Sequence, residues 1–155
     1  MPYDVFISYS HKDRKLRDEL ATHLSNLRRQ GIISDWFDGD IIPGSKWQPA
    51  IMDTLKKAQI ILLLVSADFI ASDFCYGEEL TIAIERDQAG KACVLPILLR
   101  PVDWTGAPFA DLQLLPSGAK PITLWPTHDE AFADVIAGIR KAIDGLKKKG
   151  VAPNP

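Results

Sequence analysis

Side chains that could do chemistry gather in three short segments, each of which follows a predicted strand. They supply hydroxyl groups, carboxylates and aromatic rings: Ser8, Tyr9, Ser10, Asp38, Asp40, Trp47, Phe74, Cys75, Glu78 and Glu79. Aromatic rings can stack on a planar group such as a nucleobase or a nicotinamide ring. A carboxylate can bind ribose hydroxyls or stabilise positive charge on a sugar. The three segments together therefore supply groups able to contact a planar ring and a sugar.

Motifs that commonly hold phosphates or metals are absent from the sequence. Neither a Gly-x-Gly-x-x-Gly fingerprint nor a P-loop occurs, so a nucleotide would have to be held in another way. His11, His23 and His128 are scattered and lack the spacing of metal ligands. Cys75 and Cys93 form neither a disulfide framework nor a zinc motif, which is typical of a cytoplasmic protein with reduced thiols. We therefore expect no metal and no resident cofactor.

Ordinary structural roles compete with the chemical ones for several of these residues. Ser10 is well placed to cap the first helix, and Trp47 could pack beneath its own loop. Cys75 is more typical of a small buried apolar residue than of a nucleophile. Glu78 and Glu79 could be solvated carboxylates that the dipole of a helix N-terminus favours. The sequence pattern alone leaves these alternatives open.

Helical phase distinguishes the two adjacent glutamates. Leu80 and Ala83 belong to the apolar face of the predicted helix, and Glu79 lies at the border of that face. Glu78 falls in a more exposed sector of the same helix. A partly enclosed carboxylate is more easily tuned by its surroundings for a chemical role. The phase therefore favours Glu79.

Strand and helix patterns alternate along the whole chain. Strands are predicted at residues 3–8, 32–37, 59–66, 92–99 and 122–125, and helices at residues 10–30, 47–57, within 68–89 and at 129–148. This order predicts an α/β fold with a doubly wound, five-stranded, mostly parallel sheet and helices on both faces. Pro96 argues that its strand lies at a sheet edge or contains a bulge. Such sheets bind ligands beyond the carboxyl ends of their strands, where the strand order reverses.

Length, charge and hydropathy exclude several classes of protein. The 155 residues fit one domain, and the formal net charge of −2 provides no excess of positive charge for binding nucleic acid. The longest apolar run, Ile60–Val65, is far too short to span a bilayer, and no signal peptide is evident, so we expect a cytoplasmic domain without membrane contact. We expect the domain at residues 1–147, with 148–155 as a tail or linker to a further domain.

Four segments resemble the Toll/interleukin-1 receptor (TIR) domain family, in its bacterial form. They are residues 3–10 (YDVFISYS), 38–47 (DGDIIPGSKW), 66–80 (SADFIASDFCYGEEL) and 94–104 (VLPILLRPVDW). The first resembles the family's first-strand signature, and the second resembles its BB loop. The third resembles the segment that carries the family's glutamate, and the fourth resembles the fourth strand with its loop. Together the resemblance covers about residues 3–145, nearly the whole chain.

The resemblance implies a flavodoxin-like sheet with the BB loop, residues 38–46, beside the active cleft. It also implies interaction residues within that loop: Asp40, Ile41, Ile42, Pro43 and Gly44. The family's glutamate is followed by an apolar residue, which matches Glu79, with Glu78 as the second choice. Many members carry a tryptophan four residues before the glutamate. This chain has Cys75 at that distance from Glu79 and Phe74 at that distance from Glu78.

The resemblance implies one of two activities. Many bacterial and plant TIR domains cleave NAD+ to nicotinamide and ADP-ribose or a cyclic variant, whereas many animal TIR domains are adaptors that assemble through TIR–TIR contacts. Our hypothesis is the enzyme, an NAD+ glycohydrolase with Glu79 as its catalytic carboxylate and NAD+ as substrate rather than cofactor. Substrate contacts would come from Ser8, Tyr9, Ser10, Asp38, Trp47, Phe74 and Cys75. Expected partners are other TIR domains, in an oligomer or filament, and a C-terminal sensor domain, in bacterial immunity such as antiphage defence. The alternative is a non-catalytic interaction module.

Overall fold

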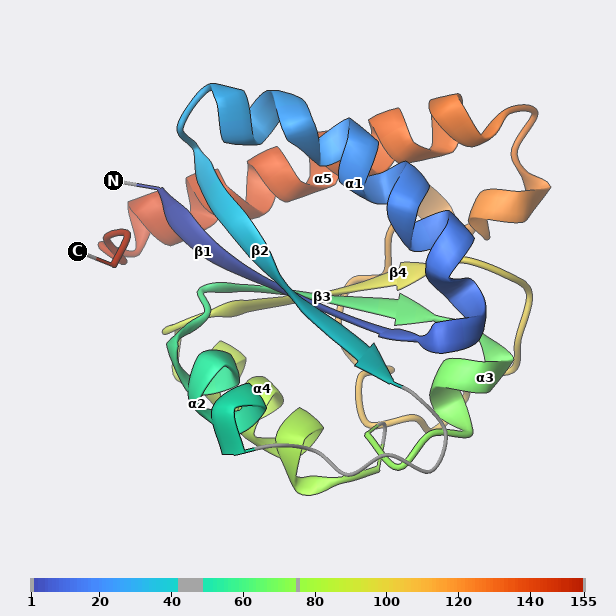
Figure 1. The fold of residues 1–155 in the computed structure, drawn as a ribbon, viewed down its shortest axis with the longest axis horizontal. Helices are drawn as coiled ribbons and strands as arrows, with labels where there is room; N and C mark the ends of the chain where they lie inside the picture. Colours follow the sequence, from blue (N-terminus) through green and yellow to red (C-terminus); the bar gives the residue numbers. More distant parts are fainter. Residues whose placement is uncertain (1, 42–48, 75, 155) are drawn as a thin grey trace.

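A computed structural model describes residues 2–41, 49–74 and 76–154, with only the backbone described at 49 and 50. This part of the chain forms an α/β fold around a parallel four-stranded sheet (Figure 1). The strands are β1 (Tyr3–Ser10), β2 (Ile33–Ile41), β3 (Ile60–Val65) and β4 (Cys93–Leu98). Their order across the sheet is β2-β1-β3-β4, and every adjacent pair is parallel.

Helices cover both faces of the sheet. Figure 1 shows α1 (Arg14–Arg29) and α5 (His128–Lys148) side by side over one face, and α2 (Pro49–Lys57) and α4 (Glu78–Gln88) over the other. Shorter elements complete the described part of the chain: α3 (Ala67–Ile70) and the 3-10 turns η1 (His11–Asp13), η2 (Ser117–Ala119) and η3 (Ile122–Leu124). The loop and helix predicted between residues 68 and 89 are confirmed in the helix α4, while the segment before it also contains the short helix α3.

Two apolar cores explain why the sheet carries helices on both faces. All six residues of β3 are buried, as its continuous apolar run predicts for a central parallel strand. Successive side chains of a strand point to opposite faces. On β3, Leu62 therefore joins the core beneath α1 and α5, and Leu63 joins the core beneath α2 and α4.

The prediction of a fifth strand at residues 122–125 is wrong. Residues 122–124 form the 3-10 turn η3, in which Leu124 donates its N–H to the Pro121 carbonyl at 2.9 Å. Pro121 and Pro126 flank this run, and neither can donate a backbone hydrogen bond to a sheet ladder. Beyond β4 the chain instead forms an isolated parallel bridge at Leu115.

The outer edge of β4 is satisfied by the protein itself. The Val94 N–H donates to the Asp87 carboxylate at 2.8 Å, and the Leu98 N–H donates to the Leu115 carbonyl at 2.7 Å. Pro96 lies between them and has no N–H to leave unpaired. The predicted position of Pro96 at a sheet edge is therefore confirmed, and this edge offers few free groups to another strand.

The C-terminal segment lies against the opposite, N-terminal end of the strands. The Tyr3 hydroxyl donates to the Val151 carbonyl at 2.7 Å, and the Asn154 amide donates to the Asp4 carboxylate at 2.8 Å. These contacts order the chain beyond α5, on the side of the sheet away from the predicted site. Among the helices that the structure describes, none is both long enough and apolar enough to cross a lipid bilayer.

Candidate active site

The carboxyl ends of β1, β2 and β3 lie at one edge of the sheet (Figure 1). Ser8, near the end of β1, pairs with Gly39 on β2 and with Leu63 on β3. The strand order reverses between β1 and β3, which is where doubly wound sheets bind their ligands. The strands that precede the predicted site segments therefore end at one edge of the sheet.

The predicted site residues are nevertheless divided between the two faces of the sheet. Val5, Ile7 and Tyr9 belong to the core beneath α1 and α5, whereas Phe6 belongs to the core beneath α2 and α4. Because side chains alternate along a strand, Ser8 lies on the same face as Phe6. Tyr9 and Ser8 therefore point to opposite sides of β1.

Arg17 of α1 contacts both Tyr9 and Asp38 on the face of the sheet that α1 covers. Its Nη2 donates to Asp38 Oδ2 at 2.7 Å, and its guanidinium carbon lies 5.4 Å from the centre of the Tyr9 ring. Tyr9 has no exposed surface, and its hydroxyl oxygen has no hydrogen bond of good geometry within the described residues. Burial, followed by the Asp38 carboxylate, raises the pKa of the Tyr9 hydroxyl far above its ordinary range. Tyr9 is thus an uncharged part of the core.

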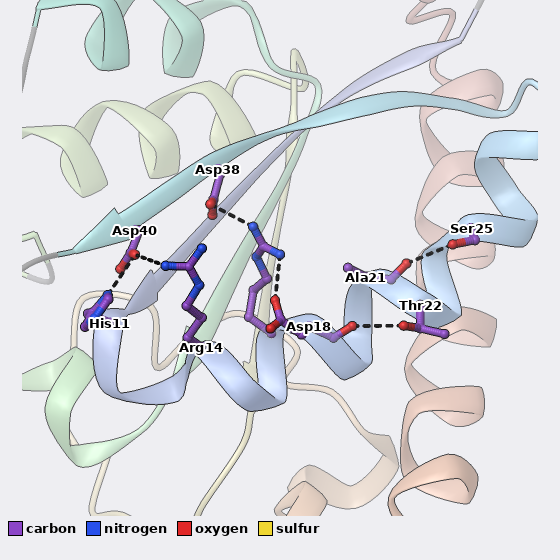
Figure 2. Close-up of polar contacts among 9 residues, drawn as sticks. His11, Arg14, Asp18, Ala21, Thr22, Ser25, Asp38 and Asp40 are labelled. Atoms are coloured by element: carbon purple, nitrogen blue, oxygen red, sulfur yellow. Dashed lines mark hydrogen bonds and ion pairs between the residues drawn. The ribbon is translucent and has the colours of Figure 1, made fainter.

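The Asp40 carboxylate is held on the same face as Asp38. Figure 2 shows both carboxylates on β2 directed toward α1 and the turn before it. Asp40 Oδ2 lies 2.9 Å from His11 Nδ1 and 3.9 Å from Arg14 Nη1. Both carboxylates are therefore in contact with cationic or hydrogen-bond-donating side chains of their own chain.

These positions correct part of the predicted binding site. The sequence pattern groups Tyr9 and Asp38 with Glu79, but β-strand alternation directs the first two toward α1, while Glu79 lies on α4 across the sheet. A buried ring cannot stack on a ligand in this conformation, so Tyr9 does not form the predicted aromatic wall. Phe74 also differs from the expectation, because it is fully buried and packs at 6.0 Å from the Phe69 ring centre.

The two serines of β1 have different roles. The Ser10 hydroxyl accepts a hydrogen bond from the Lys12 N–H at 3.3 Å, which confirms the capping role, although the cap begins the 3-10 turn η1. Ser8 is fully buried, and its hydroxyl has no hydrogen-bond partner among the residues described. Burying a hydroxyl without a partner is costly, so Ser8 is the more unusual of the two.

A buried polar network occupies the point where β1, β3 and β4 end. The carboxylate of Asp13, whose side chain is 2% exposed, accepts hydrogen bonds from the Ser66 hydroxyl and from Arg100 Nε, the latter at 2.9 Å. Arg100 Nη2 also donates to Asp68 Oδ2 at 2.7 Å. Lys12 lies 3.5 Å from the other oxygen of Asp68. The network therefore ties together the segments that follow β1, β3 and β4.

Sequence reasoning misses this network. The spacing of Ser10 and Asp13 predicts a capping box, but the Asp13 carboxylate is used by Ser66 and Arg100 instead. The signal that could have found it is Arg100, a charged residue directly after a buried strand run. Its partners come from distant parts of the chain, so their pairing depends on the strand order.

Glu79 is the half-buried carboxylate on the other face of the sheet. It lies in the first turn of α4, whereas the adjacent Glu78 is exposed, as the helical phase predicts. Glu79 Oε2 lies 2.7 Å from where a Cβ on Gly77 would be, so the carboxylate folds back over the start of the helix. No hydrogen bond or ion pair to another described residue holds it. Its charge is favoured at a helix N-terminus and remains available to a ligand.

The remaining predicted contacts fall partly outside the described residues. Trp47, Cys75 and the loop residues Ile42, Pro43 and Gly44 are among those the structure does not describe. Ile41 ends β2 and packs, half-buried, against the core beneath α2 and α4. Within the described ranges, no group of three or more histidine, cysteine or acidic side chains could hold a metal ion.

The sequence matches a known protein family over most of its length. The family model described as the TIR domain matches residues 5–136, which include most of β1, all of β2, β3 and β4, and the whole of α4. The chain belongs to the TIR domain family. The strand order β2-β1-β3-β4 agrees with the flavodoxin-like arrangement of that fold.

Three relatives illustrate the range of proteins to which this TIR domain is similar. Uncharacterized protein y4lF of Sinorhizobium fredii (strain NBRC 101917 / NGR234) is 50% identical over 149 residues, which are 96% of this chain and 46% of that protein. The probable 2' cyclic ADP-D-ribose synthase TcpO of Methanobrevibacter olleyae is 30% identical over 97 residues, or 62% of this chain and 27% of TcpO. Toll-like receptor 2 of Ovis aries is 28% identical over 137 residues, 84% of this chain and 17% of the receptor. The chain therefore spans less than half the length of each of these relatives.

Proposed function

We propose that this TIR domain cleaves NAD+ at the bond between nicotinamide and ribose, with Glu79 as the catalytic carboxylate. The observation that carries the proposal is the half-buried carboxylate of Glu79 in the first turn of α4, which has no ion-pair or hydrogen-bond partner among the described residues. Its oxygen Oε2 lies against Gly77, at the start of α4. Ser8 lies on the same face of the sheet, and its fully buried hydroxyl has no hydrogen-bond partner among the described residues. A contact between this hydroxyl and substrate would require the side chains that cover it to move.

Comparison with the other carboxylates of this edge supports the choice of Glu79. Asp38 is paired with Arg17, and Asp40 is paired with His11. Asp13 and Asp68 share Arg100. A carboxylate that is already neutralised by an arginine adds little field at a developing cation, whereas an uncompensated one adds the full effect of its charge. Of these five carboxylates, Glu79 is therefore best suited to stabilise positive charge on a substrate.

The proposed reaction requires only modest chemistry from the protein. The bond between C1′ of the ribose and the pyridinium nitrogen breaks, and both electrons leave with neutral nicotinamide. The sugar then carries oxocarbenium character, which Glu79 stabilises directly or through the ribose hydroxyls. Water attacks C1′ and loses a proton to give ADP-ribose, or a nucleophile of the same substrate attacks to give a cyclic product. The similarity to TcpO, a probable 2' cyclic ADP-D-ribose synthase, supports this class of product.

The assembly and cellular setting form part of the same proposal. We expect the domain to act in the cytoplasm after self-association, as part of a longer protein whose other domain senses a signal, in a role such as antiphage defence. The loop residues Ile42, Pro43 and Gly44, together with Asp40 and Ile41, are the proposed contacts between TIR domains.

A direct assay tests the proposal. Purified protein is incubated with NAD+ over a wide range of protein concentrations, and nicotinamide and ADP-ribose products are separated by chromatography. The proposal expects nicotinamide release whose rate per molecule rises with protein concentration. Absence of nicotinamide at every concentration, including conditions where light scattering shows assembly, contradicts it.

The similarity to Toll-like receptor 2 favours a second candidate, a non-catalytic signalling module. In that case the domain would bind other TIR domains through the loop at residues 38–46, and Glu79 would be an ordinary first-turn carboxylate. The assay above distinguishes the two, because an interaction module assembles without releasing nicotinamide.

A further inference from the structure

Arg100 bridges two carboxylates that belong to different elements. Its Nε donates to Asp13 at the start of α1, and its Nη2 donates to Asp68 in α3. The Asp13 side chain is 2% exposed, and those of Arg100 and Asp68 are about one third exposed, at 36% and 31%. The planar guanidinium can serve both acceptors at once, which an ammonium group cannot do with the same geometry. Arg100 therefore fixes α3 relative to the ends of β1 and β4.

A continuous series of contacts leads from this bridge to Glu79. The Ser66 hydroxyl donates to Asp13 and also accepts the Phe69 N–H at 3.2 Å, as the N-cap of α3. The Phe69 ring packs against the Phe74 ring at a centre-to-centre distance of 6.0 Å. Every step from Arg100 to the segment before α4 is thus a direct contact.

The last steps of the series reach the carboxylate itself. The Phe74 carbonyl accepts the Gly77 N–H at 3.2 Å, and Gly77 is the N-cap of α4. Glu79 Oε2 lies against Gly77, in the space that a side chain there would fill. A shift of α3 would therefore move Phe74, the start of α4 and the Glu79 carboxylate together.

We infer that Arg100 is a positioning residue for Glu79. Its contacts with Asp13 and Asp68, together with the bond between Ser66 and Asp13, hold α3 in place. The packing of Phe69 against Phe74 then holds the start of α4. The inference rests on the proposed function in so far as Glu79 is catalytic. Arg100 itself is not assigned a contact with substrate. Its role is to hold the segment 66–79 in the arrangement that presents the carboxylate.

Arg100→Lys separates positioning from simple charge compensation. Lysine keeps a positive charge next to the buried Asp13 carboxylate, so the fold is retained. It cannot reproduce the two directed hydrogen bonds, so the tie between Asp13 and Asp68 is lost. Arg100→Gln removes the charge as well and leaves Asp13 uncompensated, which makes it the harsher variant.

The test measures amide hydrogen exchange and steady-state kinetics on the same preparations. For Arg100→Lys we expect exchange in peptides covering residues 66–80 to accelerate about tenfold, with α5 unchanged, because opening is local. We expect kcat for nicotinamide release to fall about tenfold while KM stays within about twofold, because the carboxylate is misplaced rather than removed. Arg28→Lys is the matched control, since Arg28, near the end of α1, forms an ion pair of the same 2.9 Å length with the exposed Asp35 of β2.

Three results would overturn the inference. Unchanged exchange at residues 66–80 shows that Arg100 does not hold this segment, and equal acceleration in α5 shows only global destabilisation. Accelerated exchange at residues 66–80 with unchanged kcat shows that the segment does not position the active carboxylate. If the wild-type protein releases no nicotinamide, the proposed function fails. The exchange of residues 77–80 then still decides whether Arg100 holds the start of α4.

Discussion

The Glu79 carboxylate occupies the space that a side chain at residue 77 would need, so only glycine fits there without moving it. Glu79 Oε2 lies 2.7 Å from the position that a Cβ at residue 77 would take, and the Asp73 carbonyl lies 2.6 Å from the same point. The φ angle of Gly77 is −92°, which any residue can adopt. Glycine is therefore required here for space rather than for backbone conformation, and the space is used by the carboxylate.

Replacing Gly77 by alanine should displace the Glu79 carboxylate. The new methyl group would clash with the Asp73 carbonyl and with Glu79, so we expect a loss of about 1–3 kcal/mol in the free energy of unfolding from overpacking. We also expect nicotinamide release to fall by about tenfold or more. Gly145→Ala in α5 is the control, because nothing lies within 4 Å of its added Cβ. That change should stabilise the protein by up to about 1 kcal/mol and leave activity unchanged. Equal activity of the two variants would contradict the importance of this contact.

Ser8→Ala should separate stability from substrate binding. The wild-type hydroxyl is buried without a partner among the described residues, so its removal should leave the free energy of unfolding unchanged or raise it by about 1 kcal/mol. If the hydroxyl contacts substrate, KM for NAD+ should rise severalfold at the same time. Ser10→Ala is the comparison, because it removes a cap hydrogen bond and should cost about 1 kcal/mol. Chemical denaturation and initial rates measure both effects, and a clear loss of stability in Ser8→Ala would refute the view that its hydroxyl is unsatisfied.

The ion pair of Asp68 should make stability depend on pH in the acidic range. The hydrogen bond from Arg100, and then the charge of Lys12, lower the pKa of Asp68 below its usual value. A lowered carboxyl pKa contributes stability above the pKa of the unfolded chain, and this contribution is lost as the pH falls through the folded-state pKa. Asp68→Asn should therefore lower the melting temperature at pH 7, with a difference that shrinks as the pH falls below about 4.

Thermal unfolding between pH 7 and pH 3 measures this convergence. Asp35→Asn is the control, since Asp35 is 83% exposed in its pair with Arg28 and should contribute little. A melting-temperature difference for Asp68→Asn that stays constant across this range would argue against the ion pair.

Cys93 should be poorly reactive in the native protein. Burial, and then the nearby Asp87 carboxylate, raise the pKa of its thiol to about 11. At pH 8 only about one thiol in a thousand would be ionised, and the thiolate is the nucleophile. In a Cys75→Ser background, we expect iodoacetamide to modify Cys93 far more slowly in the native state than in guanidinium chloride. Mass spectrometry follows the reaction, and similar rates in the two states would disprove the effect of burial.

Local patterns made much of the fold predictable. The apolar run of β3 and the stripe of leucines in α1 each determine a burial pattern that tertiary packing preserves. Residues 122–125 have the composition of a strand, but flanking prolines and the bridge at Leu115 exclude them from the sheet. That outcome depends on how the chain returns along β4, which no local pattern encodes.

The candidate site was predictable in its parts but not in its division between two faces. Helical phase correctly separates the half-buried Glu79 from the exposed Glu78. The sequence does not reveal that Asp38 is held by Arg17, because that contact depends on α1 crossing β2 on one side of the sheet. Nor does it reveal Asp13, whose partners lie at the ends of other strands. Long-range pairing of charges is decided by topology.

The claim that Glu79 is the catalytic carboxylate is tested most directly by replacing each of the two adjacent glutamates with glutamine. Glu79→Gln and Glu78→Gln are each assayed for nicotinamide release under assembling conditions, after circular dichroism has shown that both are folded. Loss of the half-buried charge should reduce turnover by about a hundredfold or more in Glu79→Gln. Glu78→Gln, which changes an exposed side chain, should stay within about twofold of wild type. Wild-type turnover by Glu79→Gln would contradict the account, and a dead Glu78→Gln beside an active Glu79→Gln would assign the chemistry to the other glutamate.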